Sequence, residues 1–199
     1  THDKTDVIVI DSSGNVGIST ASPQGLFHIQ ESAVTGFDAH ADDEVIFESQ
    51  SLLNMNFVNS VGTYILFSDA DRNRGNIRYD HSSNFLSFAT NDGSERMRID
   101  SAGNVGIGVT PETWTSGETA LQIGGNTSIR ATTAQGANGS LSFGQNVYVN
   151  SGYKYISTDQ ASAMIMGDGV ISLNVAASGS ADAAITWNQA LTVNNDGNV

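Results

Sequence analysis

The stretch "DSAGNVGIG" (residues 100–108) occurs almost unchanged as "DSSGNVGIS" at residues 11–19, and its first part returns as "NNDGNV" at residues 194–199. Each copy opens with Asp or Asn and has a glycine three residues later, at Gly14, Gly103 and Gly197, so successive copies are 89 and 94 residues apart. Recurrence of this kind indicates a tandem repeat. We therefore expect the end of a preceding repeat with a hairpin at residues 1–20, one β module at 21–110, and a second at 111–199 that is truncated at the next copy.

Within the phrase, the first half is typical of a three-residue hairpin loop. Such a loop is usually a type I turn followed by a residue in the left-handed region. Asp100 would begin the turn, Ser101 and Ala102 would form its centre, and Gly103 would adopt the positive φ. This interpretation requires no ligand.

The second half, "NVGIG", predicts a strand with one apolar face and one bare face. Val105 and Ile107 point to one side, whereas Gly106 and Gly108 leave the other side without side chains. Glycine weakens a strand unless another backbone approaches closely or the strand bends. We expect the bare face to pack against another chain around a three-fold axis. The spacing is neither G-x-G-x-x-G nor a P-loop, so it does not indicate a nucleotide site.

The rest of the chain alternates with a period of two residues, as β-strands do. Leu53, Met55 and Phe57 alternate with asparagines in "LLNMNFVN", and "FLSFAT" and "ERMRI" repeat the pattern. No window of 12 or more residues shows helical periodicity. The fold class predicted is all-β, with tandem sandwich-like or prism-like modules of short antiparallel strands. Residues 77–105 align with 171–199 without a gap, which places Met97 and Ile99 opposite Leu191 and Val193.

Composition excludes several classes of function. The chain has 199 residues, with 21 acidic against 8 basic side chains and a net charge of −13. Binding to nucleic acid or to an anionic membrane would need a basic patch. The chain lacks cysteine, so disulfides and thiolate metal sites are excluded. The sequence shows neither a signal peptide nor a membrane-spanning apolar run, and its abrupt start and end suggest a fragment.

The motif "ERMRIDSAGNVGIGVTP", with the upstream "IRYDHSSNFLSFATNDGS", closely resembles a module of bacteriophage tail fibres and related virion proteins. The likeness is strongest over residues 63–111, clear in 6–30 and fainter over 120–199. In that family the module often precedes an intramolecular chaperone domain of the endosialidase type, and no such region occurs in this sequence. Some secreted bacterial adhesins carry the same phrase.

The resemblance implies a homotrimeric, intertwined β-rich shaft or receptor-binding tip of a virion, assembled in the host cytoplasm. The implied partners are copies of the same chain, other virion proteins and a host cell-surface glycan, without nucleic acid, membrane insertion or cofactor. The family module has no shared catalytic residues. Three alternatives remain open: a capsid-surface fibre or head decoration, a polysaccharide-depolymerising tailspike, and a secreted bacterial adhesin.

Candidate sites compete with simpler interpretations. Asp69, Asp71 and Asn73 alternate in "DADRNRGNIRYD", with Asp80 at its end, as in a calcium loop. Three interleaved arginines and a misplaced glycine favour a polar turn instead. The segment "FDAHADDEV" (37–45) is more typical of a solvated loop than of a metal site.

Aromatic side chains are the candidates for sugar stacking. These are Trp114, Tyr148, Tyr153 and Tyr155, although packing between strands is the interpretation we favour. His28 could stack near a symmetry axis, but a hydrogen-bonded or surface role is the one we favour. No nucleophile elbow or catalytic triad is recognisable. We therefore predict no enzymatic activity, no catalytic residues and no bound metal.

Overall fold

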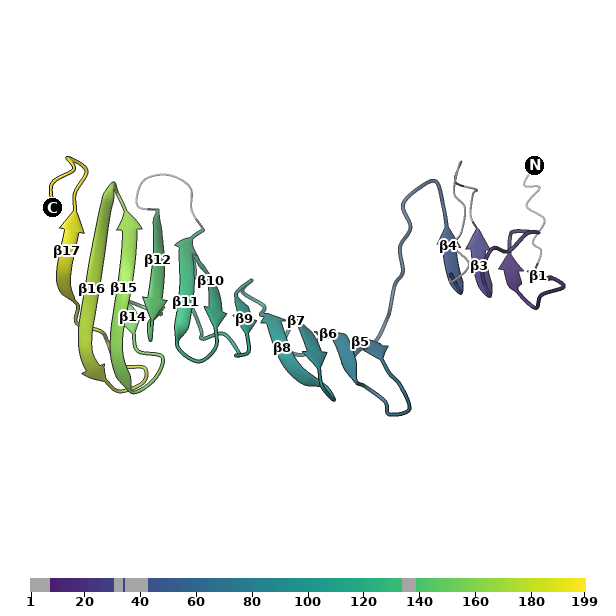
Figure 1. Cartoon of the computed structure of the whole chain (residues 1–199), viewed down its shortest axis with the longest axis horizontal. Helices are drawn as coiled ribbons and strands as arrows, with labels where there is room; N and C mark the ends of the chain where they lie inside the picture. Colours follow the sequence, from purple (N-terminus) through teal and green to yellow (C-terminus); the bar gives the residue numbers. More distant parts are fainter. Residues whose placement is uncertain (1–7, 31–33, 35–42, 134–138) are drawn as a thin grey trace. The chain divides into compact units, whose positions relative to one another are not determined.

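The computed structural model describes residues 8–30, 34, 43–133 and 139–199. These residues form seventeen strands and no helix, which confirms the all-β prediction (Figure 1). Two compact units are present, residues 1–57 and 58–199, and each is described separately. In the described part of the chain, membrane-spanning helices are absent.

Unit 1 contains one four-stranded sheet in the order β1-β2-β3-β4 among its described residues. The strands are β1 (Ile8–Ile10), β2 (Val16–Ile18), β3 (Phe27–Gln30) and β4 (Val45–Glu48). The β1–β2 hairpin is antiparallel, whereas β2, β3 and β4 run parallel to one another.

Unit 2 contains an eleven-stranded sheet in its described part, and the strands lie in the order of the sequence, as Figure 1 shows. The first five, which form an antiparallel meander, are β5 (Gly62–Phe67), β6 (Gly75–Asp80), β7 (Phe85–Thr90), β8 (Ser94–Ile99) and β9 (Val105–Ile107). The next six are β10 (Glu118–Ile123), β11 (Thr127–Thr132), β12 (Ser140–Gln145), β15 (Asp159–Gly167), β16 (Val170–Gly179) and β17 (Asn188–Val193). β10 pairs parallel to β9, and every later pair is antiparallel.

A short hairpin and neighbouring loops cover one face of this sheet near its C-terminal end. The hairpin consists of β13 (Tyr148–Val149) and β14 (Tyr153–Lys154). Trp114 and Tyr148 pack with Ala120 of β10, and Tyr155 packs with Ala161 and Ala176. The described strands therefore form one large sheet with a partial second layer, rather than the two matched sheets of a sandwich.

A buried arginine joins two strands of the sheet by an ion pair and also hydrogen-bonds to the hairpin. The guanidinium of Arg130, on β11, donates to Oε2 of Glu118 at 2.8 Å and to the hydroxyl of Tyr153 at 2.9 Å. Arg130 is almost fully buried, and a buried charge without a partner would be strongly destabilising. The neighbouring carboxylate of Glu118 compensates that charge.

The repeated phrase has the same topology in both units. In each copy, an antiparallel hairpin is followed by a loop and then by a parallel strand. Gly17 is paired with His28 between β2 and β3, and Gly106 is paired with Gln122 between β9 and β10. The likeness detected in the sequence is therefore also a likeness of strand order and register.

The gap-free alignment of residues 77–105 with 171–199 does not hold for every strand. β8 and β17 correspond as aligned, but the residues aligned with β7 are 179–184, which are the last residue of β16 and the loop that follows it. The strand pairing gives a different correspondence between the repeats. Phe88 pairs with Met97 and Leu173 pairs with Leu191, and a bulge follows each pair, so Phe88 corresponds to Leu173. The connection before β17 is longer than that before β8, which the ungapped comparison concealed.

The alternating segment at residues 52–59 forms no strand, contrary to the sequence prediction. Leu53 and Met55 are exposed, and the boundary between the compact units falls within this segment, after Phe57. The predicted boundary at residues 110 and 111, by contrast, lies between β9 and β10, which are neighbours in one sheet. The boundary between the sequence repeats, at residues 110 and 111, thus differs from the boundary between the compact units, after Phe57.

Candidate functional site

One face of the large sheet carries a continuous set of apolar side chains. Residues that pair directly across strands lie on the same face of a sheet. Two rows of such partners cross unit 2, and together we call them the apolar face. The first row is Ile65, Ile77, Phe88, Met97, Ile107 and Ile123. The second row is Leu86, Ile99, Val105, Leu121, Ile129, Phe143, Met164, Leu173 and Leu191.

Many side chains of the apolar face are open to solvent in the single chain. The exposed fractions are 42% for Phe143, 41% for Leu173 and 42% for Leu191. Their sequence neighbours on the opposite face, such as Ser142 and Asn174, are buried. Exposed apolar patches of this extent are rare on soluble monomers and mark interaction surfaces.

Unit 1 follows the same design on a smaller scale. Ile8, Ile18, Ile29 and Phe47 are successive register partners across its four strands. Ile8 and Phe47 are exposed, whereas His28, Ile46 and Glu48 on the other face are buried. Both units therefore present an apolar face and cover a more polar one.

The turn predicted for the repeated phrase is confirmed in all three copies. The N–H groups of Gly14, Gly103 and Gly197 donate to the carbonyl oxygens of residues 11, 100 and 194 at 3.0–3.1 Å. The three glycines have φ between +78° and +87°. At the second copy, Oδ1 of Asp100 accepts from the backbone N–H groups of Ala102 and Asn104, at 2.9 and 2.8 Å.

Asn104 connects this turn to the next parallel strand. Its Nδ2 donates to Oδ2 of Asp100, and its Oδ1 accepts the backbone N–H of Ala120 at 3.0 Å. Only 1% of Asn104 is exposed. Sequence reasoning assigned no role to this residue, although its place after each turn glycine was a usable signal.

The bare face of the glycine strand packs within its own chain, so the expected contact with another chain at this face is wrong. A Cβ built on Gly106 would lie 2.1 Å from the carbonyl oxygen of Val109 and 2.8 Å from Cδ of Pro111. Gly17 is equally confined, by Thr20 and Pro23. Gly108 has a different role, since it has open space and a φ of +68°. The glycine strand is therefore shaped by the loop that follows it.

A buried polar side chain holds that loop in each copy. Oε1 of Gln122 accepts the backbone N–H of Glu112 at 3.0 Å, and Nδ1 of His28 accepts that of Gln24 at 3.3 Å. Both side chains are fully buried. His28 is thus hydrogen-bonded within its unit, and sequence reasoning missed its relation to Gln122.

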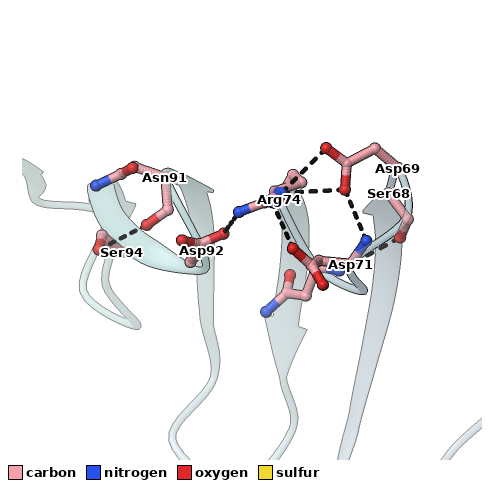
Figure 2. A network of polar contacts seen from close by, with 8 residues as sticks. Ser68, Asp69, Asp71, Arg74, Asn91, Asp92 and Ser94 are labelled. Atoms are coloured by element: carbon pink, nitrogen blue, oxygen red, sulfur yellow. Dashed lines mark hydrogen bonds and ion pairs between the residues drawn. The ribbon is translucent and has the colours of Figure 1, made fainter.

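The candidate calcium loop contains an arginine among its carboxylates. Figure 2 shows Arg74 between Asp69 and Asp71 on one side and Asp92 on the other. Nε of Arg74 donates to Asp69 at 3.0 Å, and the two terminal nitrogens reach Asp71 and Asp92 at 2.5 Å. The pKa of Asp69 is lowered, first by the backbone N–H of Asp71 and then by Arg74.

The other members of the calcium candidate have separate partners. Asn73 accepts a hydrogen bond from Asn76, and Asp80 contacts Arg78, Ser82 and Ser83. The guanidinium thus occupies the position that a cation would take among the exposed carboxylates, so the loop is a polar turn. In the described part of the chain, no group of three or more His, Asp or Glu side chains is arranged to hold a metal ion.

The second acidic candidate lies largely outside the described residues. Asp38, His40 and Asp42 lie outside the described residues, whereas Asp43 and Glu44 are described and exposed.

The aromatic candidates for sugar stacking are mostly core residues. Trp114, Tyr148 and Tyr155 have exposed fractions of 4–6%, and Tyr153 is half-buried in an edge-to-face contact with Trp187. The hydroxyl of Tyr148 donates to Oδ1 of Asp182 at 2.7 Å, and burial raises the pKa of Tyr148 to about 12. Packing between strands, the favoured interpretation, agrees with these positions.

Neither a comparison with protein-family models nor a search of curated proteins gives a match for this chain.

Proposed function

We propose that the chain is a non-enzymatic structural segment of a bacteriophage tail fibre, in which three copies bury their apolar faces together. The single observation that carries the proposal is the apolar face, which extends over all eleven strands of the large sheet. Removing such a surface from water stabilises association by roughly 25 cal/mol for each Å² of apolar area. The sequence resemblance supports the virion assignment.

Three-fold closure suits a surface of this kind. A closed ring of identical chains buries the same face of every copy and leaves no apolar surface for uncontrolled addition. The polar faces, with their loops and the β13–β14 hairpin, would then point outward. Three copies would also present three equal sites to a host surface glycan, so that weak individual binding is reinforced by avidity. This is the contribution we assign to host-receptor attachment.

Location in the particle tests the virion assignment. Antibodies against the chain, applied to purified particles of a phage that encodes it, should label tail fibres in electron micrographs. Labelling of the head would instead support a capsid-surface fibre, and particles that bind no antibody would contradict a virion role. Incubation with host polysaccharide should release no reducing ends, whereas their release would indicate a depolymerising tailspike.

A further inference from the structure

In both units, a glycine-containing strand, the loop that follows it and the next parallel strand form a unit that we call the joint: β2 to β3 in unit 1 and β9 to β10 in unit 2. The two joints differ in one chemical respect that affects their response to pH. In each, a buried side chain on the parallel strand accepts a backbone N–H from the preceding loop. In unit 2 that acceptor is the amide oxygen of Gln122, which does not titrate. In unit 1 it is Nδ1 of His28.

The contacts of His28 define the form of its imidazole ring. Because Nδ1 accepts the N–H of Gln24, that nitrogen carries no proton. The proton lies on Nε2, which is 3.1 Å from Oε2 of Glu48 on β4. The ring is fully buried, so water does not compete for either position. A neutral imidazole therefore satisfies both neighbours.

A second proton on the ring would affect the two neighbours in opposite ways. The Glu48 contact would become an ion pair, which favours the charged ring. Nδ1–H would meanwhile face the N–H of Gln24, so two donors would oppose each other and that hydrogen bond would be lost. Histidine is the side chain whose ordinary titration falls between pH 5 and 8.

Glu48 is the titratable group that faces His28 among the described residues. It comes from the neighbouring parallel strand, and Gln30 and the backbone N–H of Val34 also donate to its carboxylate. Those two donors, led by Val34, lower the pKa of Glu48 from its ordinary value of 4.5. The Glu48 carboxylate is thus held in its charged form, and the loop contributes the uncharged backbone amide of Gln24.

We propose that His28 binds the loop at residues 20–25 in a pH-dependent way. The hydrogen bond from Gln24 to Nδ1 holds the loop at neutral pH, and protonation of the ring releases it. The loop includes Thr20 and Pro23, which pack over Gly17. Its release therefore loosens the first joint, while the second joint, held by Gln122, is unaffected. The device lies on the covered face of the sheet and does not depend on the proposed function.

Hydrogen exchange of the full chain, measured by mass spectrometry at pH 7.5 and 5.5 and corrected for intrinsic rates, tests this inference. Protection of the Gln24 amide should fall by about three- to tenfold at pH 5.5, as expected for the loss of one backbone hydrogen bond. The Glu112 amide, bonded to Gln122, is the internal control and should keep its protection. An unchanged Gln24, or an equal fall at both amides, would overturn the proposal.

The variant His28→Gln provides the matched substitution, because Gln122 shows that glutamine suits the equivalent position. In this variant the Gln24 amide should be equally protected at both pH values. A persistent loss of protection in His28→Gln would show that another group is responsible. The comparison of Gln24 with Glu112 in the natural chain remains decisive even if the variant does not fold.

Discussion

At the scale of single residues, the repeated phrase is a structural joint whose chemistry is specified position by position. Asp or Asn accepts the turn amides, glycine supplies the positive φ, and Asn104 joins the turn to the following strand. The next glycine of the strand is required for space rather than for its backbone angle, because a loop carbonyl lies against it.

Gly106→Ala should destabilise the protein by about 1–3 kcal/mol, because the added methyl group meets the backbone of Val109 and the ring of Pro111. Gly125→Ala is the control, since its added Cβ would have no atom within 4 Å. Chemical denaturation should place the control within about 0.5 kcal/mol of the natural chain. Equal stability of the two variants would contradict the packing described for the joint.

Asn104→Ala should cost about 1–3 kcal/mol, because it leaves the buried N–H of Ala120 without its acceptor. Asn198, the equivalent residue of the third copy, is exposed, so Asn198→Ala should have little effect. Chemical denaturation measures the stability of both variants. A similar loss of stability in both would show that the burial of Asn104 does not cause the effect.

The Asp11 turn should become weaker in acid. Its hydrogen bonds, led by the backbone N–H of Asn15, lower the pKa of Asp11 from the ordinary value of 3.8. A lowered folded-state pKa gives stability that is present above the ordinary pKa and is lost as the pH falls through the folded-state value. The melting temperature should therefore decrease below about pH 4.

Asp11→Asn tests the contribution of this single carboxyl group, because Asn194 forms the same turn in the third copy. The variant should show a smaller acid-induced decrease in melting temperature than the natural chain. An identical decrease would assign the effect to other carboxyl groups with lowered pKa, such as Asp80.

At the scale of strands and hairpins, the sequence predicted local conformation better than it predicted partners. The turn at Asp100–Gly103 and the all-β class follow from short-range rules and were correct. The prediction that another chain packs against Gly106 was wrong, because a glycine in a strand indicates that some backbone approaches closely but does not identify which one. The segment around Leu53 alternates correctly for a strand, yet pairing depends on a neighbour that alternation does not specify.

The polar sites show the same limit. The carboxylates around Arg74 come from two different loops, and the ion pair with Asp92 joins residues 18 positions apart. Spacing along the chain made Asp69 and Asp71 candidates for a calcium loop, although a polar turn was favoured, and it could not show that Arg74 lies between the carboxylates. Likewise, the burial of Trp114 depends on the β13–β14 hairpin, which is distant in sequence.

The attachment of the β13–β14 hairpin should weaken in strong alkali. Burial, and then the hydrogen bond to Asp182, raise the pKa of Tyr148 to about 12, from an ordinary value of 10.0. A raised folded-state pKa of a phenol gives stability that is complete below the ordinary value and is lost as the pH rises from about 10 to about 12. Tyr148→Phe should therefore lose less stability between pH 9 and 11 than the natural chain. An equal loss would indicate that Tyr148 ionises normally.

At the scale of the whole molecule, the apolar face is the feature that indicates assembly. A single chain leaves Phe143, Leu173 and Leu191 partly exposed along a large sheet. The hairpin and neighbouring loops of the same chain cover part of the opposite face, over β10, β15 and β16. We attribute the covered face to folding of the unit and the apolar face to assembly.

A substitution at the centre of the apolar face should separate assembly from folding. Leu173→Glu would place a charge between the chains of the proposed trimer, where burial of an unpaired charge is strongly unfavourable. It should dissociate the assembly while the circular dichroism spectrum keeps its strand signal. Ser101→Glu, which adds the same charge at an exposed turn, is the control and should assemble normally.

Sedimentation equilibrium of the natural chain shows directly whether three copies associate through the apolar face. We predict a single species with three times the mass of the chain at micromolar concentration, and a species with the mass of one chain for Leu173→Glu. A natural chain that stays folded and sediments as a monomer at every concentration would contradict the burial of the apolar face between copies.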